Sequence, residues 1–395
     1  MNDERLVEAL RSLPTPDAAA AARRASDLVL AAHAGRLRTG RRRRRWVATV
    51  LASVIAVGGT LTAVQGAAVA RWVRDTLRSA GHPSAQPAGL AALPGGGRLL
   101  VSTGRDAWVV GQGLTRAVAH TPGASVAWSA FGNYVACACG QTLDAVALNG
   151  RIAWIEHFAE PVRAPVWSPD GNRIAFAVGH ELYVTAGDGT GVRALRAGGH
   201  STALLGLAAW RPGPGHELAV HNLDGRVSLI DTDTDTYVAQ IAIGPRAVSL
   251  SWSGNGHRLL VASAQTLAVY NAAGHLITER RAPRATTIRA ARLAPSGQQI
   301  GLLLTKARGG QEALLTSVAR PHASRVLLVG GSLGDLLFSP DGRWLLVGWH
   351  ELDSWMFFTT AARHTQIRQV THVAAQLAHS EPAVIAWCCT QPPPA

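Results

Sequence analysis

Short runs of alternating apolar and polar residues, separated by tight turns, recur along most of this chain. The clearest example is residues 165–195, PVWSPDGNRIAFAVGHELYVTAGDGTGVRAL. Alternation with a period of two is typical of β-strands, because successive side chains point to opposite faces. In the Pro-Asp-Gly break, proline fixes φ, aspartate bonds back to the backbone and glycine accepts positive φ. The stretch therefore predicts short strands joined by tight turns.

The same unit repeats. Each copy has an apolar strand that ends at a marker position, then Ser-Pro-Asp-Gly or a related turn, then a second apolar run. The marker residues, in chain order, are Ala92, Trp128, Trp167, Trp210, Trp252, Ala294 and Phe338. The steps between them are 36, 39, 43, 42, 42 and 44 residues, and so regular a period indicates a repeat architecture.

Two further strands follow in each copy, as in ELYVT and the run after GDGTG. Four antiparallel strands in about 42 residues correspond to one β-propeller blade. We expect the marker aromatics to pack between neighbouring blades. These structural positions are Trp128, Trp167, Trp210, Trp252, Phe338 and Trp387.

The last marker, Trp387, lies in the C-terminal segment EPAVIAWCCTQPPPA, which resembles the first strand of another unit. The first copy lacks a convincing first strand before Ala92. We predict that residues 383–389 supply the innermost strand of the first blade, which pairs otherwise open edges. The result is an all-β, seven-bladed propeller over residues 91–390, with six or eight blades as alternatives because the first copy is degenerate.

The WSPDG…IAF…LYV…DGTG arrangement resembles the TolB-like and WD-repeat-like propeller family, most strongly at 167–171 and 338–342. Blades without regular Trp-Asp dipeptides are closer to the TolB style. The resemblance implies binding or scaffolding at the ends of the ring and no particular ligand. The layout of tail, anchor and propeller is also similar to membrane-anchored bacterial propellers.

Residues 46–70 contain no charged residue and, as a helix, are long enough to cross a lipid bilayer. The run RLRTGRRRRR precedes them, so we predict a single-pass cell-membrane anchor with the N-terminus cytoplasmic and the propeller extracytoplasmic. A cleaved secretory signal ending at Ala68-Val69-Ala70 and a buried core helix are the alternatives. Residues 71–90 are expected to form a juxtamembrane helix and linker.

The tail, residues 1–45, is basic and partly helical by pattern, with Leu6, Val7, Leu10 and Leu13 on one helical face. It either docks a cytoplasmic partner or serves only to orient the anchor. Eleven of its residues are arginine and five are acidic, so about half of the net charge of +13 lies there. No basic stripe is evident in the repeats, and we therefore expect no nucleic-acid partner.

Candidate chemistry is sparse. DTDTDT, from Asp231, resembles the start of a calcium loop, but Thr236 and Ala242 occupy the positions that need glycine and an acid. GDGTG, at 187–191, is not followed by a helix as a phosphate-binding loop would be. No hydrolase, zinc-protease or nucleotide-binding motif is present. We expect no catalytic residues, no metal and no cofactor.

The four cysteines are Cys137, Cys139, Cys388 and Cys389. If the ring closes as predicted, the two pairs lie on neighbouring blades. A disulfide between them would then lock the seam outside the cytoplasm, with the pairing open. The alternative is that all four are small buried apolar residues.

These observations favour a non-enzymatic, membrane-anchored propeller that binds or scaffolds a protein, peptide or envelope ligand. The bilayer itself is the second expected partner, through residues 46–70. One alternative is a transmembrane sensor whose tail engages a cytoplasmic regulator such as a sigma factor. Another is an enzyme that uses the propeller funnel.

Overall fold

The computed structural model describes Leu90 and residues 93–111, 113–199, 202, 204–243, 247–361, 365–377 and 381–389. The predicted tail (1–45), the predicted membrane anchor (46–70) and residues 71–89 of the linker lie outside this part of the chain. Among the described residues, no helix combines the length and the apolar character needed to cross a bilayer.

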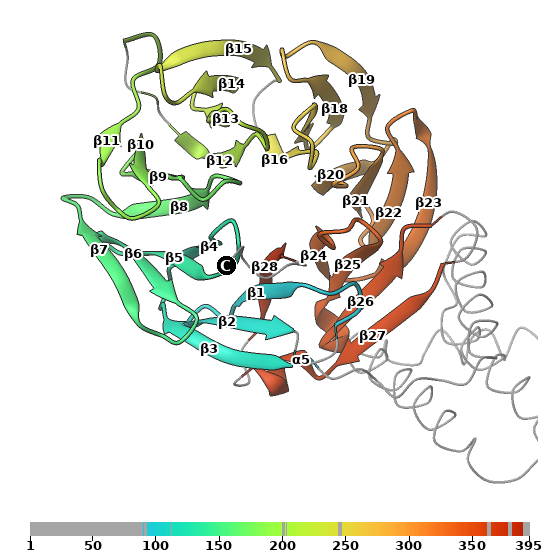
Figure 1. The fold of residues 1–395 in the computed structure, drawn as a ribbon. Helices are drawn as coiled ribbons and strands as arrows, with labels where there is room; N and C mark the ends of the chain where they lie inside the picture. Colours follow the sequence, from blue (N-terminus) through green and yellow to red (C-terminus); the bar gives the residue numbers. More distant parts are fainter. Residues whose placement is uncertain are drawn as a thin grey trace, which may run out of the picture. The chain divides into compact units, whose positions relative to one another are not determined.

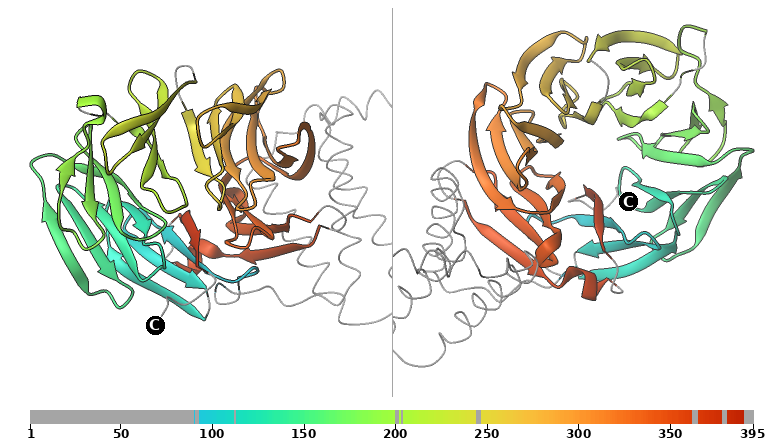
Figure 2. Two further views of the ribbon diagram at one scale, coloured as in Figure 1. Left: turned by 45° about the horizontal axis from the view of Figure 1, so that its top comes forward. Right: turned by 180° about the vertical axis from the view of Figure 1, so that it is seen from behind.

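The described strands form seven four-stranded antiparallel sheets arranged in a ring (Figures 1 and 2). The all-β, seven-bladed propeller predicted from the repeats is therefore confirmed. Blades are numbered here from the one that contains β1, and the strands of each blade are given from innermost to outermost.

Blade one comprises β28 (Ala383–Cys388), β1 (Arg98–Ser102), β2 (Asp106–Gly111) and β3 (Leu114–His120). Blade two comprises β4 (Ser125–Trp128), β5 (Tyr134–Cys139), β6 (Thr142–Ala147) and β7 (Ile152–His157). Blade three comprises β8 (Val162–Trp167), β9 (Arg173–Val178), β10 (Glu181–Ala186) and β11 (Arg193–Ala194). Blade four comprises β12 (Leu204–Trp210), β13 (Glu217–Asn222), β14 (Arg226–Asp231) and β15 (Thr236–Ala242).

Blade five comprises β16 (Ala247–Trp252), β17 (Arg258–Ser263), β18 (Thr266–Asn271) and β19 (Leu276–Arg281). Blade six comprises β20 (Thr286–Leu293), β21 (Gln299–Lys306), β22 (Gln311–Ser317) and β23 (Arg320–Gly330). Blade seven comprises β24 (Leu333–Phe338), β25 (Trp344–Trp349), β26 (Ser354–Thr359) and β27 (Ile367–Thr371). The short helices η2 (Ala197–Gly199), η3 (His350–Leu352) and α5 (Val373–Gln376) lie in connecting segments.

The ring closes where the two ends of the propeller sequence meet. Strand β28 pairs antiparallel with β1, with Trp387 opposite Leu99 and Ala386 opposite Leu100. The predicted closing strand is thus confirmed, and the alternatives of six or eight blades are excluded. Closure joins residues almost 300 positions apart in the sequence and gives β1 a neighbour on its inner edge.

Apolar packing crosses this seam as it crosses the other blade junctions. Leu99 and Val101 of blade one form a single buried cluster with Trp355 and Phe357 of blade seven. The ring of Trp387 meets Phe357 edge to face, with centroids 5.6 Å apart. Aromatic pairs of this geometry stabilise packing beyond the area they bury. Blade one therefore completes its core against blade seven.

The repeated turns take the conformation that their residues favour. In blade three, Ser168 Oγ donates to Asp170 Oδ1 over 2.5 Å, and the Gly171 N–H donates to the Ser168 carbonyl. Gly171 has a φ of 77°, which a residue with a Cβ rarely adopts. The turn after Phe338 in blade seven repeats these contacts, so the Ser-Pro-Asp-Gly signal encodes a local structure.

Ala92 lies outside the described residues, and the other markers lie at or next to the ends of the innermost strands, between blades. Trp210 Nε1 donates to the Val166 carbonyl of blade three over 2.9 Å, and Trp252 Nε1 donates to the Ala209 carbonyl of blade four over 3.1 Å. Trp387 Nε1 donates to the Gly96 carbonyl over 2.9 Å. The marker residues buried in inter-blade clusters are Trp128, Trp210, Trp252, Ala294, Phe338 and Trp387, while Trp167 is partly buried.

One buried carboxyl group lies at the seam. Asp335, the extra residue of a β-bulge in β24, has a φ of 46°, and its Oδ1 accepts the Val384 N–H of β28 over 3.0 Å. Its Oδ2 is buried and has no hydrogen-bond partner in the structure. Gly348 leaves room for this group, because a Cβ there would come within 2.7 Å of Oδ2. Burial raises the pKa of Asp335 to about 7, although the bond from Val384 opposes this change.

The raised pKa predicts how the substitution Asp335→Asn changes stability with pH. The folded state holds this proton more tightly than the unfolded state, so ionisation weakens folding as pH rises from about 4 to about 7. Asparagine keeps an acceptor for Val384 and cannot ionise. The free energy of unfolding of the variant, relative to the wild type, should therefore rise between pH 5 and pH 8, by on the order of 2 kcal/mol.

Urea unfolding of the full chain at the two pH values measures this difference. Asp224→Asn, at an exposed aspartate of the β13–β14 turn, is the matched control and should show no such rise. Equal pH dependence in the two variants would contradict the assignment of Asp335 as a buried, ionisable seam group.

Candidate functional site

Antiparallel pairing fixes which turns share a face of the ring. Turns between the innermost and second strands, such as 168–171, lie on what we call the first-turn face. Turns between the second and third strands, such as 140–141 and 179–180, lie on the opposite, second-turn face. The segments that connect one blade to the next also lie on the second-turn face.

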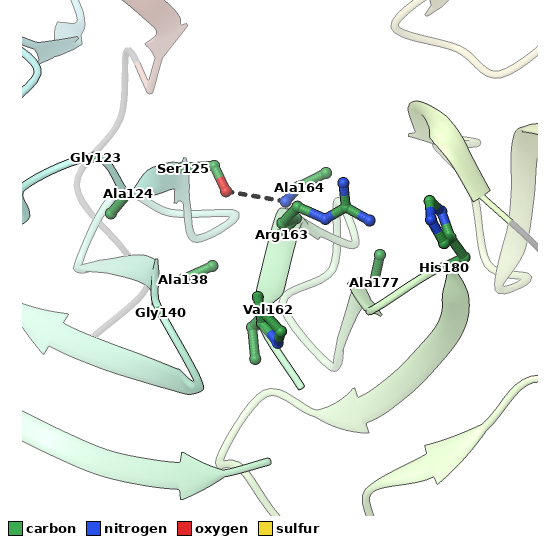
Figure 3. A pocket seen from close by; sticks show the side chains of 11 residues that line it. Gly123, Ala124, Ser125, Ala138, Gly140, Val162, Arg163, Ala164, Ala177 and His180 are labelled. Carbon is green, nitrogen blue, oxygen red and sulfur yellow. Dashed lines mark hydrogen bonds between the residues drawn. The ribbon is translucent and has the colours of Figure 1, made fainter. Parts of the chain in front are cut away.

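A cavity of about 580 Å³ opens on the second-turn face between blades two and three (Figure 3). We call it the blade two–three cavity. The innermost strands β4 and β8 contribute to its wall, so it borders the central opening of the ring. Most of its lining residues are small, and the full set is Gly123, Ala124, Ser125, Ala138, Gly140, Pro161, Val162, Arg163, Ala164, Ala177 and His180.

Three polar side chains line this cavity. Ser125 Oγ accepts the Ala164 N–H over 2.9 Å, which ties the two innermost strands together. The Arg163 guanidinium donates to the Gly179 carbonyl, a contact that holds it over the β9–β10 turn. His180, in the same turn, is exposed, and both side chains flank the cavity in Figure 3. The combination of small lining residues and a few polar groups is typical of binding sites.

An acidic residue stands near this pair. Glu160 precedes the cavity-lining Pro161, and a Cβ at Gly179 would overlap its carboxylate. Glycine at this position therefore makes room for Glu160 beside the Arg163 contact. Arg163 and His180 are among the residues that line the cavity, and Glu160 is not.

A second polar cluster joins blades three and four on the first-turn face. His216 Nε2 lies 2.8 Å from Asp170 Oδ2, and its Nδ1 lies 2.6 Å from Asp233 Oδ2. Arg173 Nη2 pairs with the other Asp233 oxygen over 2.5 Å. Because carboxylates occupy both nitrogens of the ring, His216 is not free to act as a general base or a metal ligand. The cluster is therefore an inter-blade clamp.

The charges of the clamp support one another. Partial burial disfavours a charged ring, but the bonds with Asp233 and Asp170 outweigh it and raise the pKa of His216. Partial burial likewise opposes ionisation of Asp170, yet bonds from Ser168, the Asn172 backbone and His216 lower its pKa to about 2. Both shifts favour the charged forms of His216 and Asp170.

The cysteines differ from the expected seam disulfide. Cys388 is bonded to Cys389, while Cys137 and Cys139 are free thiols. The sulfurs of the bonded pair lie 3.8 and 3.5 Å from the Ala130 carbonyl, in the turn before β5. Cys139 lies at the other end of β5, so the length of the strand separates the two pairs. Burial, with Cys139 and Asp144 nearby, raises the pKa of Cys137 to about 12, which makes this thiol unreactive.

The other sequence candidates have structural partners. Asp233 and Asp235 of the DTDTDT run pair with Arg173 and Arg193 of blade three. Asp188 of GDGTG accepts the N–H and hydroxyl of Thr190 within its own turn. Across the described ranges, no group of three or more potential metal-ligating side chains has the arrangement for an ion.

Sequence reasoning missed Arg163 and His180. The two residues come from one blade, but the cavity they line needs blade two as its other wall. Arginine before a small residue in an innermost strand carries no motif. Only the register of the strands and the junction between blades could have identified them.

No protein family profile and no curated protein matches the chain. Among solved structures it is similar to Kluyveromyces lactis Hsv2, with a TM-score of 0.53 and 15% identity, over 70% of this chain and 95% of that one. The WD40 domain of Toxoplasma gondii coronin gives a TM-score of 0.46 at 15% identity, over 62% and 69% of the two chains. Kuenenia stuttgartiensis hydrazine synthase gives 0.46 at 13% identity, over 59% and 75%. At these identities the likeness concerns the propeller fold alone.

Proposed function

We propose that this chain is a non-enzymatic, membrane-anchored propeller that binds a protein or peptide partner outside the cytoplasm. The observation that carries the proposal is the blade two–three cavity at the mouth of the ring. Its small residues leave space, and its convergent polar groups, Arg163 and His180, offer hydrogen-bond donors. A propeller frame suits this role because loops and cavities at its ends sit on a rigid scaffold.

The anchor is proposed from the sequence of residues 46–70. Their uncharged run follows a block of five arginines, Arg41–Arg45, which favours retention of the N-terminus in the cytoplasm. The propeller then lies on the other side of the bilayer, where its second-turn or first-turn face can meet a partner.

Membrane extraction tests the anchor. The full chain should stay with the membrane pellet in alkaline carbonate, because an apolar span resists release. A variant lacking residues 46–70 should move to the supernatant. Deletion of residues 11–35, a segment of the same length, is the control and should leave the chain in the pellet. Release of the intact full chain by carbonate would contradict a membrane-spanning anchor.

Site-directed photo-cross-linking in the native membrane tests the binding function. A photoreactive phenylalanine at His180 should give a discrete adduct with a protein or peptide, and one at Arg368, on the outermost strand β27, should not. Ala124→Phe, which fills the cavity, should reduce the His180 adduct at least about tenfold, since displaced contacts are lost outright. Ala153→Phe on the exposed outer strand β7 is the matched control.

Identical adducts from positions 180 and 368, or an adduct that Ala124→Phe leaves unchanged, would contradict binding at the cavity. The thermal unfolding midpoint of each variant, compared with the wild type, establishes that the propeller remains folded in these measurements.

A further inference from the structure

The charged residues of the innermost strands are mostly arginines, and they differ in how exposed they are to solvent. The seven innermost strands, β28, β4, β8, β12, β16, β20 and β24, contain four charged residues: Arg163, Arg289, Arg292 and Asp335. The three arginines are exposed, and Asp335 is half-buried. These strands surround the central opening of the ring, which we call the channel (Figure 1), and the exposed charged residues that they carry are arginines.

Arg292 is one of these exposed arginines. It lies on β20 of blade six, and its Nη1 reaches the Leu250 carbonyl of β16, the innermost strand of blade five, at 3.4 Å. The side chain is open to solvent, yet surrounding protein lowers the pKa of its guanidinium. One long bond to a carbonyl leaves most of its donors free for a ligand.

Arg163 lies on the far side of the ring. Strands β8 and β20 face each other across the central opening (Figure 1). Arg163 donates to the Gly179 carbonyl at the edge of the blade two–three cavity, so its guanidinium is held at the channel mouth. The cavity and the channel are therefore bordered by fixed guanidinium groups on opposite sides.

The acidic groups nearby do not cancel these charges. Asp335 is directed into the seam, where it accepts the Val384 N–H, and burial raises its pKa to about 7. Glu160 lies beside Gly179 but is not among the residues that line the cavity. No ion pair joins Arg163, Arg289 or Arg292 to a carboxylate among the described residues, whereas Arg173, Arg193 and Arg211 each have one.

We propose that the channel and the blade two–three cavity bind an acidic peptide segment, whose carboxylates pair with Arg163 and Arg292. This inference rests on the proposed function and specifies the chemistry of the partner. Guanidinium groups form bidentate bonds with carboxylates, and arginines without carboxylate partners attract a ligand of opposite charge. An extended chain with several carboxylates can reach both sides of the ring, which a single small anion cannot do.

Fluorescence anisotropy with the full chain in detergent tests the proposal. The probe is a fluorescein-labelled deca-glutamate peptide, with deca-glutamine and deca-lysine peptides for comparison. Deca-glutamate should bind, the other two should not, and added salt should weaken the binding because exposed charges are screened. Arg292→Gln and Arg163→Gln should each weaken binding about tenfold or more, since each removes a charge-assisted hydrogen-bond donor.

Matched variants separate charge in the channel from net charge. Arg368→Gln removes the same charge from the exposed outer strand β27 and should leave the affinity within about twofold of the wild type. Arg292→Lys keeps the charge and should retain more binding than Arg292→Gln. Unfolding midpoints of all variants, measured in the same detergent, identify any change that reflects lost structure.

Several outcomes would overturn the inference. One is equal binding of deca-glutamine and deca-glutamate, and another is unchanged affinity for deca-glutamate in a folded Arg292→Gln variant. A third is tighter binding of a labelled deca-thymidylate than of deca-glutamate, which would assign the channel to nucleic acid. If cross-linking at position 180 captures a partner while deca-glutamate fails to bind, the acidic specificity is wrong and the binding function stands. If deca-glutamate binds as expected but position 180 gives no adduct, the proposed function fails and the anion site stands.

Discussion

The pairing of β28 with β1 is the contact on which the rest of this fold depends. A four-stranded blade has two faces that both need apolar cover, and only neighbouring blades can supply it. In an open arc the first and last blades would each leave one face and one strand edge in water. The C-terminal strand removes both problems, because it completes blade one and brings Leu99 and Val101 against Trp355 and Phe357 of blade seven.

Closure of the ring also determines which polar side chains bond within the protein and which stay exposed to solvent. At the seam, the carboxyl group of Asp335 accepts the Val384 N–H. At the junction of blades three and four, the clamp joins His216 to Asp170 and Asp233 on the first-turn face. The hydrogen bonds of Asp335 Oδ1 and of the clamp all go to other groups of the protein. The arginines of the innermost strands differ, since each faces solvent and none pairs with a carboxylate in the described part of the chain. These exposed guanidinium groups without carboxylate partners are the basis of the proposal that the ring binds an acidic peptide.

The repeat predicted the fold because the blade is a local structure. The turn at 168–171 forms its hydrogen bonds between residues close in sequence, and Trp210 marks the end of a strand in its unit. A period of about 42 residues then gives the number of blades. The closing strand was predictable too, since the Trp387 segment resembles the first strand of a unit. The anchor and tail, in contrast, stay predictions because residues 1–89 lie outside the described part of the chain.

The candidate site was not predictable, because it depends on contacts between blades. Arg163 and Arg292 lie far apart in the sequence and have no motif, and they face a common opening only after the ring closes. The cysteines illustrate the same limit. Neighbouring blades were expected to bring Cys137 or Cys139 to Cys388 or Cys389, with the pairing open. Cys139 and Cys388, however, lie at opposite ends of the blades they occupy. Adjacent blades therefore do not by themselves place two side chains in contact.

Hydrogen exchange at β1 tests the closing contact most directly, by comparison of the full chain with a chain that ends at Pro382. The account predicts that the amides of Leu99, Leu100 and Val101 exchange slowly in the full chain and at least about tenfold faster without β28, because blade one then loses its inner partner and its cover. Exchange at β17 of blade five should be affected much less. Equal protection of β1 in the two chains would contradict closure of the ring by its C-terminal strand.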